Sequence, residues 1–239
     1  MKEDFMKEIF EKNGILISDL QEKQFRTYYE LLVEWNDRIN LTAITEYQEV
    51  LWKHFIDSAL FLNTDIVKNT NSASVLDLGT GAGFPGMVLA ILLPDYQFTL
   101  VDSLRKRIDF LEKVVDQCNI KNVTLIHGRA EDLGQDPQYR NQYDFVVSRA
   151  VAELPLLLEY CIPFVKVNGY FVSYKAKKYE EEIQHAENAM SVLGAELFHV
   201  KHFKLRTEEE NRYLVFIKNT MKTDKKYPRK AGKPKKKPL

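Results

Sequence analysis

Cysteines and long apolar runs are scarce in this sequence. Its 239 residues include two cysteines, Cys118 and Cys161, too few for a disulfide framework, so a reducing, cytoplasmic environment is expected. No apolar run approaches the roughly 18 residues that a membrane span needs. The first ten residues mix acidic and basic side chains and lack the apolar core of a secretory signal. We therefore expect no membrane partner, and the 45% hydrophobic content predicts a globular chain with a sizeable core.

Charge is balanced over the whole chain but is unevenly distributed. Nine of the 34 Lys and Arg residues, but one of the 34 Asp and Glu residues, lie in residues 222–239. The rest of the chain holds 25 basic and 33 acidic residues, so an acidic body carries a basic tail. Because the tail is rich in proline and poor in apolar residues, we expect it to be disordered. Two roles stay open, a solubilising end or an arm that contacts the phosphates of a polyanion.

Hydrophobic periodicity divides the chain into three parts. Residues 1–70 are expected to form a helical extension, with a capping box at Ser18 and Gln21 and a second helical stretch over about 46–63. Residues 71–220 alternate between strands and helices, and residues 221–239 form the basic tail. The expected strands are 74–78, 98–101, 123–127, 143–147 and 170–174, followed by an antiparallel pair at 197–205 and 213–217. This pattern predicts an α/β, Rossmann-like fold whose sheet is mainly parallel with an antiparallel final strand.

A glycine-rich segment, residues 77–86 (DLGTGAGFPG), follows the first expected strand. Glycines at a strand-to-helix turn let a ligand approach the backbone, and in this fold class the turn lies at the carboxyl edge of the sheet, where ligands bind. The next strand ends in Asp102. An acid about 20 residues after such a loop can accept hydrogen bonds from ribose hydroxyls.

Two cofactors compete for this loop. Gly81, Gly83 and Gly86 satisfy the dinucleotide fingerprint G-x-G-x-x-G. Asp77, Gly79, Gly81 and Gly83 form D-x-G-x-G-x-G, which resembles motif I of the class I S-adenosylmethionine methyltransferases. A pyrophosphate gains nothing from a nearby carboxylate, whereas a ligand with an ammonium and a sulfonium does, so Asp77 favours S-adenosylmethionine over a nicotinamide cofactor. A glycine turn without a ligand is disfavoured, because polar residues also follow the third and fourth strands.

Residues that are missing narrow the chemistry. Amino-group methylation usually places Asn or Asp before Pro-Pro and an aromatic residue at the fourth strand, and this chain has Ser-Arg-Ala-Val at 148–151. Methylation of a pyrimidine carbon needs an attacking thiolate, but Cys118 and Cys161 both lie in apolar helical patterns and are expected in the core. A target that already presents a lone pair, such as N7 of guanine, fits a site without a general base. We expect neither a catalytic base nor a metal ion.

Basic residues are expected around the active-site edge and on the tail. Arg149 ends the apolar fourth strand, where an unused charge is costly, so it is the candidate for positioning the substrate. For exposed lysines a solvated surface is the competing interpretation. The residues expected to contact RNA are Arg149, Lys175, Lys177, Arg212, Arg229, Lys230 and Lys233.

Several segments of the chain, including the glycine-rich loop, give it a resemblance to a known family. The chain resembles the bacterial 16S ribosomal RNA guanine-N7 methyltransferases, also called glucose-inhibited division protein B. The matching segments are 35–42, 54–58, 77–86, 102–107, 129–131, 147–152 and the tail from 228. The resemblance implies methylation of a guanine in the 530 loop of 16S rRNA. Naked RNA and a precursor of the small ribosomal subunit both stay open as the substrate, and the enzyme is expected to be a monomer. The resemblance also implies cofactor contacts at Gly79, Phe84, Asp102, Ala130, Glu131 and Arg149, to which the same segments add Ser103.

Some interpretations stay open. His54 and Asp57 lie in a matching segment, yet they can also be a buried pair that fixes the N-terminal helices to the sheet. A methyltransferase for a small molecule would not need the basic tail, and a non-catalytic RNA-binding assembly factor would not need the glycine loop and Asp102. Because the glycine loop lies in the folded body, removing the tail is expected to leave cofactor affinity unchanged.

Overall fold

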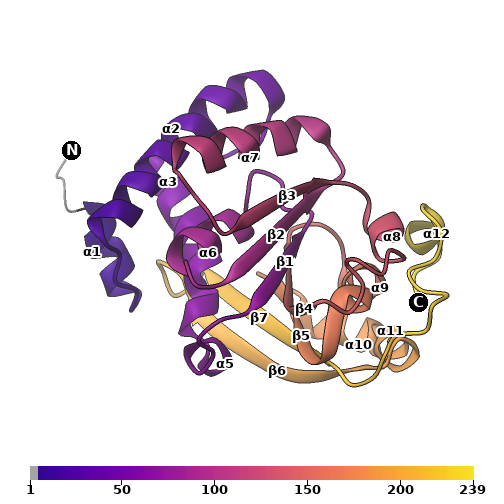
Figure 1. The fold of residues 1–239 in the computed structure, drawn as a ribbon. Coiled ribbons are helices and arrows are strands. Elements are labelled where there is room, and N and C mark those ends of the chain that lie inside the picture. Colours follow the sequence, from indigo (N-terminus) through magenta and orange to yellow (C-terminus); the bar gives the residue numbers. More distant parts are fainter. Residues whose placement is uncertain (1–4) are drawn as a thin grey trace.

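One mixed sheet forms the centre of the molecule. The structure, a computed structural model, describes residues 5–239, so the first four residues of the expected helical extension lie outside the described residues. Its strands are arranged in the order β3-β2-β1-β4-β5-β7-β6 (Figure 1). The strand bounds are β1 Ser74–Leu78, β2 Gln97–Asp102, β3 Val123–His127, β4 Tyr143–Arg149, β5 Val165–Lys175, β6 Ala195–Lys204 and β7 Asn211–Asn219.

The direction of the strands confirms the predicted fold class. Strands β1 to β5 pair in parallel, and β7 runs antiparallel to both β5 and β6. The chain order reverses where β1 lies between β2 and β4, which makes the carboxyl ends of these strands the switch point at which such sheets bind ligands. The glycine-rich loop leaves β1 at this point.

Two layers of helices cover the sheet, because alternate residues of each buried strand face opposite sides. On one side Phe98 of β2 packs in a cluster with Phe25 and Phe110, and on the other Phe171 of β5 packs with Leu157. Cys118 and Cys161 are buried, as expected for core residues. No helix within residues 5–239 is long and apolar enough to cross a membrane. The first layer contains α2 Asp19–Ile39, α6 Gly86–Leu92 and α7 Arg105–Gln117, and the second contains α9 Leu154–Cys161, η3 Ile162–Phe164, α10 Tyr179–His185 and α11 Glu187–Leu193.

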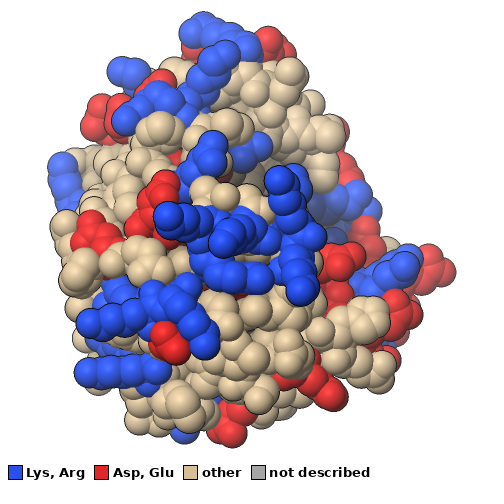
Figure 2. Space-filling model, turned by 90° about the vertical axis from the view of Figure 1, so that its right-hand side faces the viewer, with Lys and Arg blue, Asp and Glu red and all other residues tan. Residues whose placement is uncertain are grey.

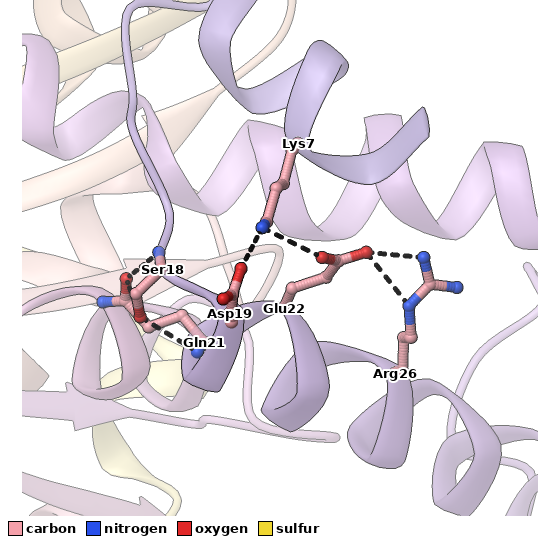
Figure 3. Close-up of polar contacts among 6 residues, drawn as sticks. All are labelled: Lys7, Ser18, Asp19, Gln21, Glu22 and Arg26. Carbon is pink, nitrogen blue, oxygen red and sulfur yellow. Dashed lines mark hydrogen bonds and ion pairs between the residues drawn. The ribbon is translucent and has the colours of Figure 1, made fainter. Parts of the chain in front are cut away.

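The N-terminal helices α1 (Phe5–Lys12) and α2 are joined by polar contacts (Figure 3) and by the packing of aromatic rings. The predicted capping box is present, since Gln21 N donates to Ser18 Oγ at 3.2 Å and Ser18 N donates to Gln21 Oε1 at 2.9 Å. Lys7 of α1 pairs with Asp19 and Glu22 of α2 (Figure 3). Exposed ion pairs contribute little stability, so the stacking of buried aromatic rings between these helices stabilises their packing more than the ion pairs do.

The second N-terminal helical stretch differs from the regular helix expected over 46–63. It begins as α3 (Tyr47–Val50), continues as a six-residue π-helix, η1 (Leu51–Ile56), and ends in α4 (Asp57–Ala59) and η2 (Leu60–Asn63), before α5 (Asp65–Lys68). The wider turn of a π-helix is rare and occurs frequently at functional sites. Hydrophobic periodicity does not distinguish it from an α-helix, and here it carries His54 to the carboxyl edge of the sheet.

The C-terminal tail packs against the folded body in this structure, whereas its composition predicts disorder. Residues 222–239 run beside α8 (Ala130–Leu133) and α9 and end in a short helix, α12 (Lys233–Lys236) (Figure 1). The Arg140 guanidinium donates to three tail carbonyls, and Arg229 forms an ion pair with Glu159, whose side chain is 1% exposed. Composition alone predicts disorder because Arg140 and Glu159, which hold the tail, lie outside it in the sequence.

Candidate active site

The glycine-rich loop is fastened to the end of the neighbouring strand. Gly79 N and Thr80 N both donate to the Val101 carbonyl, at 2.9 and 3.0 Å. Gly79 has φ +73°, and a Cβ there would lie 2.5 Å from a methyl group of Val151. A side chain is therefore excluded at Gly79 by backbone conformation and by space, which leaves its peptide open to a ligand.

Asp77 lies beneath this loop instead of on the surface that faces a ligand. Its Oδ2 accepts hydrogen bonds from Thr80 Oγ1 and Gly86 N, both at 2.7 Å, and burial raises the pKa of its carboxyl to about 6. Among the described residues Asp77 Oδ1 has no partner. The sequence predicts that Asp77 contacts a cationic cofactor, whereas here its visible role is to brace the loop. Gly83 is likewise buried, against Tyr28, Met87 and Leu111.

Asp102 ends β2 with a carboxylate that is almost fully buried at 2% residue exposure. Its Oδ2 accepts from Gly81 N at 2.9 Å and from Arg107 Nη1 at 3.1 Å, and its Oδ1 accepts from Leu104 N at 2.9 Å. The carboxylate thus fixes the glycine loop and the start of α7 relative to each other. It also borders two cavities, where it can accept hydrogen bonds from hydroxyl groups.

Three cavities meet at Val151, which borders all of them. Cavity A, about 690 Å³, lies among η1, the end of β4 and β7. Cavity B, about 400 Å³, lies between the ends of β1 and β2 and the 128–131 loop. Cavity C, about 380 Å³, lies over the glycine loop. Ala150, beside Val151, has φ +56°, a left-handed conformation that is uncommon outside glycine and concentrates at functional sites.

Cavities B and C bring together most of the residues predicted to bind a cofactor. Asp77 and Gly83 are the exceptions, since neither borders these cavities. The predicted residues that line one or both of them are Gly79, Gly81, Phe84, Asp102, Ser103, Ala130, Glu131 and Arg149.

Arg149 connects cavity C with cavity A and is held on several sides. Its Nη1 donates to Asp57 Oδ2 at 2.7 Å and to the Lys53 carbonyl at 3.0 Å, and its guanidinium carbon lies 5.1 Å from the centre of the Phe84 ring. The His54 ring stacks on Phe84 with centres 4.4 Å apart. Arg149 therefore joins both His54 and Asp57 to β4. Because both residues also line cavity A, the structural and the functional interpretation of His54 and Asp57 both stay open.

His54 is held as a neutral ring. Burial, and then the positive charge of Arg149, lower its pKa to about 3. His54 Nε2 lies 2.8 Å from Thr42 Oγ1, and the ring is closed in by Phe84 on one face. A base with so low a pKa is a weak proton acceptor near neutrality, so the ring is suited to packing and hydrogen bonding in place of proton transfer.

This lowered pKa predicts a stability loss in acid that depends on His54. The unfolded chain protonates His54 near pH 6.5, while the folded chain keeps it neutral to about 3, so the unfolded state binds more protons below 6.5. The unfolding free energy should fall by about 1–2 kcal/mol between pH 7 and pH 5 from this residue. Denaturant unfolding of the parent and of His54→Gln at pH 7 and pH 5 measures this loss. The raised pKa of Asp77 changes the unfolding free energy in the opposite direction, but equally in both proteins, so it cancels when their unfolding free energies are subtracted. A pH-independent difference would contradict the prediction.

The basic residues predicted to contact RNA fall into two groups. Arg149, Lys175, Lys177 and Arg212 line cavity A. Within this group Arg212 Nε lies 3.0 Å from Asp57 Oδ1, and Lys175 Nζ donates to Glu182 at 2.5 Å. Lys177 lies in an exposed turn after β5.

The second group lies in the tail, where one basic residue forms an ion pair with a buried glutamate and the other two are exposed. Arg229 is committed to Glu159, while Lys230 and Lys233 are exposed around α12. Figure 2 shows Lys and Arg side chains gathered in the middle of the face on which the tail lies, with acidic side chains toward its edges. This face thus carries a cluster of basic side chains although the chain has a formal net charge of zero.

Several residues of the cavities are missing from the predicted cofactor site. Arg107 reaches Asp102 from the first turn of α7, Tyr160 borders cavity B from α9, and Gly232 and Lys235 border cavity B from the tail. Only the folded chain brings the tail next to the 128–131 loop, about 100 residues away in the sequence.

Comparison with known proteins gives a consistent family. The family described as rRNA small subunit methyltransferase G matches residues 21–213. The Ribosomal RNA small subunit methyltransferase G of Lactococcus lactis subsp. lactis is 48% identical over 225 residues, which are 94% of this chain and 94% of that protein. The protein of the same name from Alkaliphilus oremlandii is 46% identical over 236 residues, 99% of this chain and 98% of that protein.

A solved structure supports the fold. The crystal structure of a SAM dependent methyltransferase from Aquifex aeolicus has a TM-score of 0.55 and 16% sequence identity, and the match covers 75% of this chain and 97% of that one. At this identity the likeness shows a common fold and nothing finer.

Proposed function

The chain belongs to the rRNA small subunit methyltransferase G family, and we propose that it transfers a methyl group from S-adenosylmethionine to N7 of a guanine in the 530 loop of 16S rRNA. The observation that carries this proposal is the meeting of cavities B and C, lined by the glycine loop and Asp102, with the basic cavity A at Val151. Cavities B and C thus suit a nucleoside cofactor, and cavity A suits an RNA substrate.

The donors and acceptors of cavities B and C suit S-adenosylmethionine. The Asp102 carboxylate is an acceptor for ribose hydroxyls, and the Gly79 and Gly81 peptides leave room for close approach. Leu78 and Val101 give cavity B an apolar floor for a base, next to Ala130 and Glu131. The bound cofactor would supply an electrophilic methyl group on a sulfonium. The chain's own contribution is to hold the cofactor so that its methyl group faces cavity A.

Cavity A suits a single guanine turned out of its RNA. Its volume of about 690 Å³ is in the range of small-ligand sites, and enzymes that modify a base take it out of the stack. Guanine N7 carries no proton, so no side chain has to act as a base. The low pKa of His54 agrees with such a site. Rate enhancement then comes from placing N7 in line with the methyl group and excluding water.

Exposed lysines of the tail are expected to add sequence-independent affinity for RNA. Replacing Lys230, Lys233 and Lys236 together by Gln should lower the slope of log K against log salt by about 2, because each phosphate contact on single-stranded RNA contributes about 0.7. Filter binding of a 16S rRNA fragment at several salt concentrations measures the slope. The matched control replaces Lys12, Lys23 and Lys68, which are exposed on other parts of the molecule. Equal slopes for both triple variants would leave the tail as a solubilising end.

We also propose finer assignments of partner and location. The substrate is 16S rRNA, naked or within a precursor of the small ribosomal subunit, and the enzyme acts as a monomer in the cytoplasm, where that RNA is assembled. Light scattering of the purified chain tests the monomer. Methylation of naked RNA and of assembled particles side by side tests the form of the substrate.

The decisive experiment maps the modified base. 16S rRNA is isolated from a strain that lacks the gene and from the same strain carrying the gene or an Asp102→Ala variant, and N7-methylguanine is located by chemical strand cleavage at that base. The expected result is one 530-loop guanine that loses its methyl group on deletion and regains it with the intact gene alone. An unchanged modification pattern would refute the rRNA substrate and favour a small molecule, and full rescue by Asp102→Ala would refute the assigned cofactor site.

A further inference from the structure

The C-terminal tail borders the cavity assigned to the nucleoside part of the cofactor. Gly232 and Lys235, at and within α12, line cavity B together with Leu78 and Val101. The ends of β1 and β2, the 128–131 loop, Val151 and Tyr160 form the rest of its lining. Without the tail, cavity B would be open on the side of α12.

The tail is held in this position by contacts that leave little freedom upstream of α12. Arg229 N, Nε and Nη2 all donate to the buried Glu159 carboxylate of α9, at 2.6 to 3.1 Å. Gln135 Nε2 donates to the Pro228 carbonyl at 2.8 Å, and Pro228 packs so closely on Gly134 that a Cβ there would lie 2.8 Å from the proline ring. The anchor immediately precedes the two residues that reach the cavity.

A direct link joins the tail to a residue of the cofactor cavity. Gly232 N donates to Glu131 Oε1 at 3.3 Å, and burial and the Glu131 carboxylate raise the pKa of the adjacent Tyr160 to about 12. Glu131, Tyr160 and Gly232 all border cavity B. The carboxylate that the family resemblance assigns to the cofactor is therefore shared with the tail.

We propose that α12 is the outer wall of the cofactor site and that the Lys235 side chain covers the adenosine part of S-adenosylmethionine. A lysine stem can lie over a flat base while its ammonium stays in water. The inference rests on the proposed function and reverses the expectation that the tail, as a segment outside the folded body, does not affect cofactor affinity. It gives the basic tail a second role besides RNA binding.

Calorimetric titration with S-adenosylhomocysteine tests the wall without requiring turnover. Lys235→Ala should weaken the binding of S-adenosylhomocysteine by about three- to tenfold, because the apolar methylene groups of one lysine side chain no longer cover the ligand. Lys236→Ala is the matched control, since it removes the same charge from the same helix at an exposed position that does not border the cavity, and it should bind like the parent. Asp102→Ala, at the other side of cavity B, is the positive control and should lose about five- to 150-fold.

Tryptic cleavage after Lys235, followed by mass spectrometry of the full chain, gives a second readout. Saturating S-adenosylhomocysteine should slow this cleavage at least about threefold, because the ligand binds the closed wall and not the displaced tail. Equal affinities of Lys235→Ala, Lys236→Ala and the parent, or cleavage unaffected by the ligand, would overturn the proposal. A parent that binds no S-adenosylhomocysteine would instead overturn the proposed function.

Discussion

Replacing Arg149 by Met is expected to slow methyl transfer by about 100- to 1,000-fold while leaving the dissociation constant for RNA within about threefold. Arg149 borders both cavity A and cavity C, so it lies where cofactor and substrate meet. Its bonds to Asp57 and Lys53 hold the π-helix against β4, and its guanidinium lies over Phe84. Without it these groups can shift by about an ångström, which is enough to misalign a reaction that depends on placement.

Arg212 provides the matched control for this prediction. It pairs with the other oxygen of Asp57 and lines cavity A, but it does not border cavity C. Arg212→Met should therefore cost less than about tenfold in rate, and Asp57 keeps one cationic partner in either variant, so both should fold. Single-turnover rates at saturating RNA, with RNA affinities measured separately, make the comparison. Equal rate losses in the two variants would mean that cavity A needs its positive charge and not the placement that Arg149 provides.

The fold could be predicted from the sequence because buried parallel strands leave a strong local pattern. The sequence predicts the buried strand β1 with its observed bounds, since it is a short apolar run that ends in turn residues. The bounds of β3 are also predicted as observed, although it is an edge strand without a fully buried residue. Strand β5 begins at Val165, five residues before the expected strand, because η3 ends the preceding helix at Phe164. The first residues of β5, Val-Lys-Val-Asn-Gly, mix apolar, charged and turn-forming side chains, so periodicity does not mark them as a strand.

The site could be predicted less completely, because several of its contacts depend on residues far apart in the sequence. Asp102 and the glycine loop follow from a motif with a known geometry. The bracing role of Asp77 does not, because motif spacing does not tell on which side of the loop the carboxylate lies. Arg149 was identified as a costly charge at a strand end, but its partner Asp57, 92 residues away, needed the fold.

The composition of the tail conceals an electrostatic contact that packs the tail against the folded body. Its nine basic residues suggest a uniformly solvated segment, yet Arg229 meets a glutamate that the fold has already removed from water. A buried carboxylate without a partner is strongly unfavourable, so Glu159 and Arg229 have to be considered together. The pair turns a segment that lacks a core of its own into a wall of the neighbouring domain.

Replacing Arg229 by Met is expected to lower the unfolding free energy by about 3 kcal/mol, because it leaves the Glu159 carboxylate buried without a cation. The reverse change, Glu159→Met, should cost no more than about 1 kcal/mol, since the Arg229 side chain is 24% exposed and can turn toward water. Urea unfolding of both single variants and of the double Met variant measures the asymmetry. The double variant should recover most of the loss, because two apolar side chains can replace the pair.

This asymmetry distinguishes a packed tail from a disordered one in solution. If the tail were disordered, Glu159 would already lack its partner in the parent protein, and Arg229→Met would change the unfolding free energy by less than about 0.5 kcal/mol. Arg229→Met should also loosen α12 and thereby weaken S-adenosylhomocysteine, whereas replacing the exposed Lys230, one residue further on, should change neither quantity. A stability loss without a loss of ligand affinity would mean that the anchor and the cavity wall act independently. A joint loss would make the Glu159–Arg229 pair the structural support of the cofactor site.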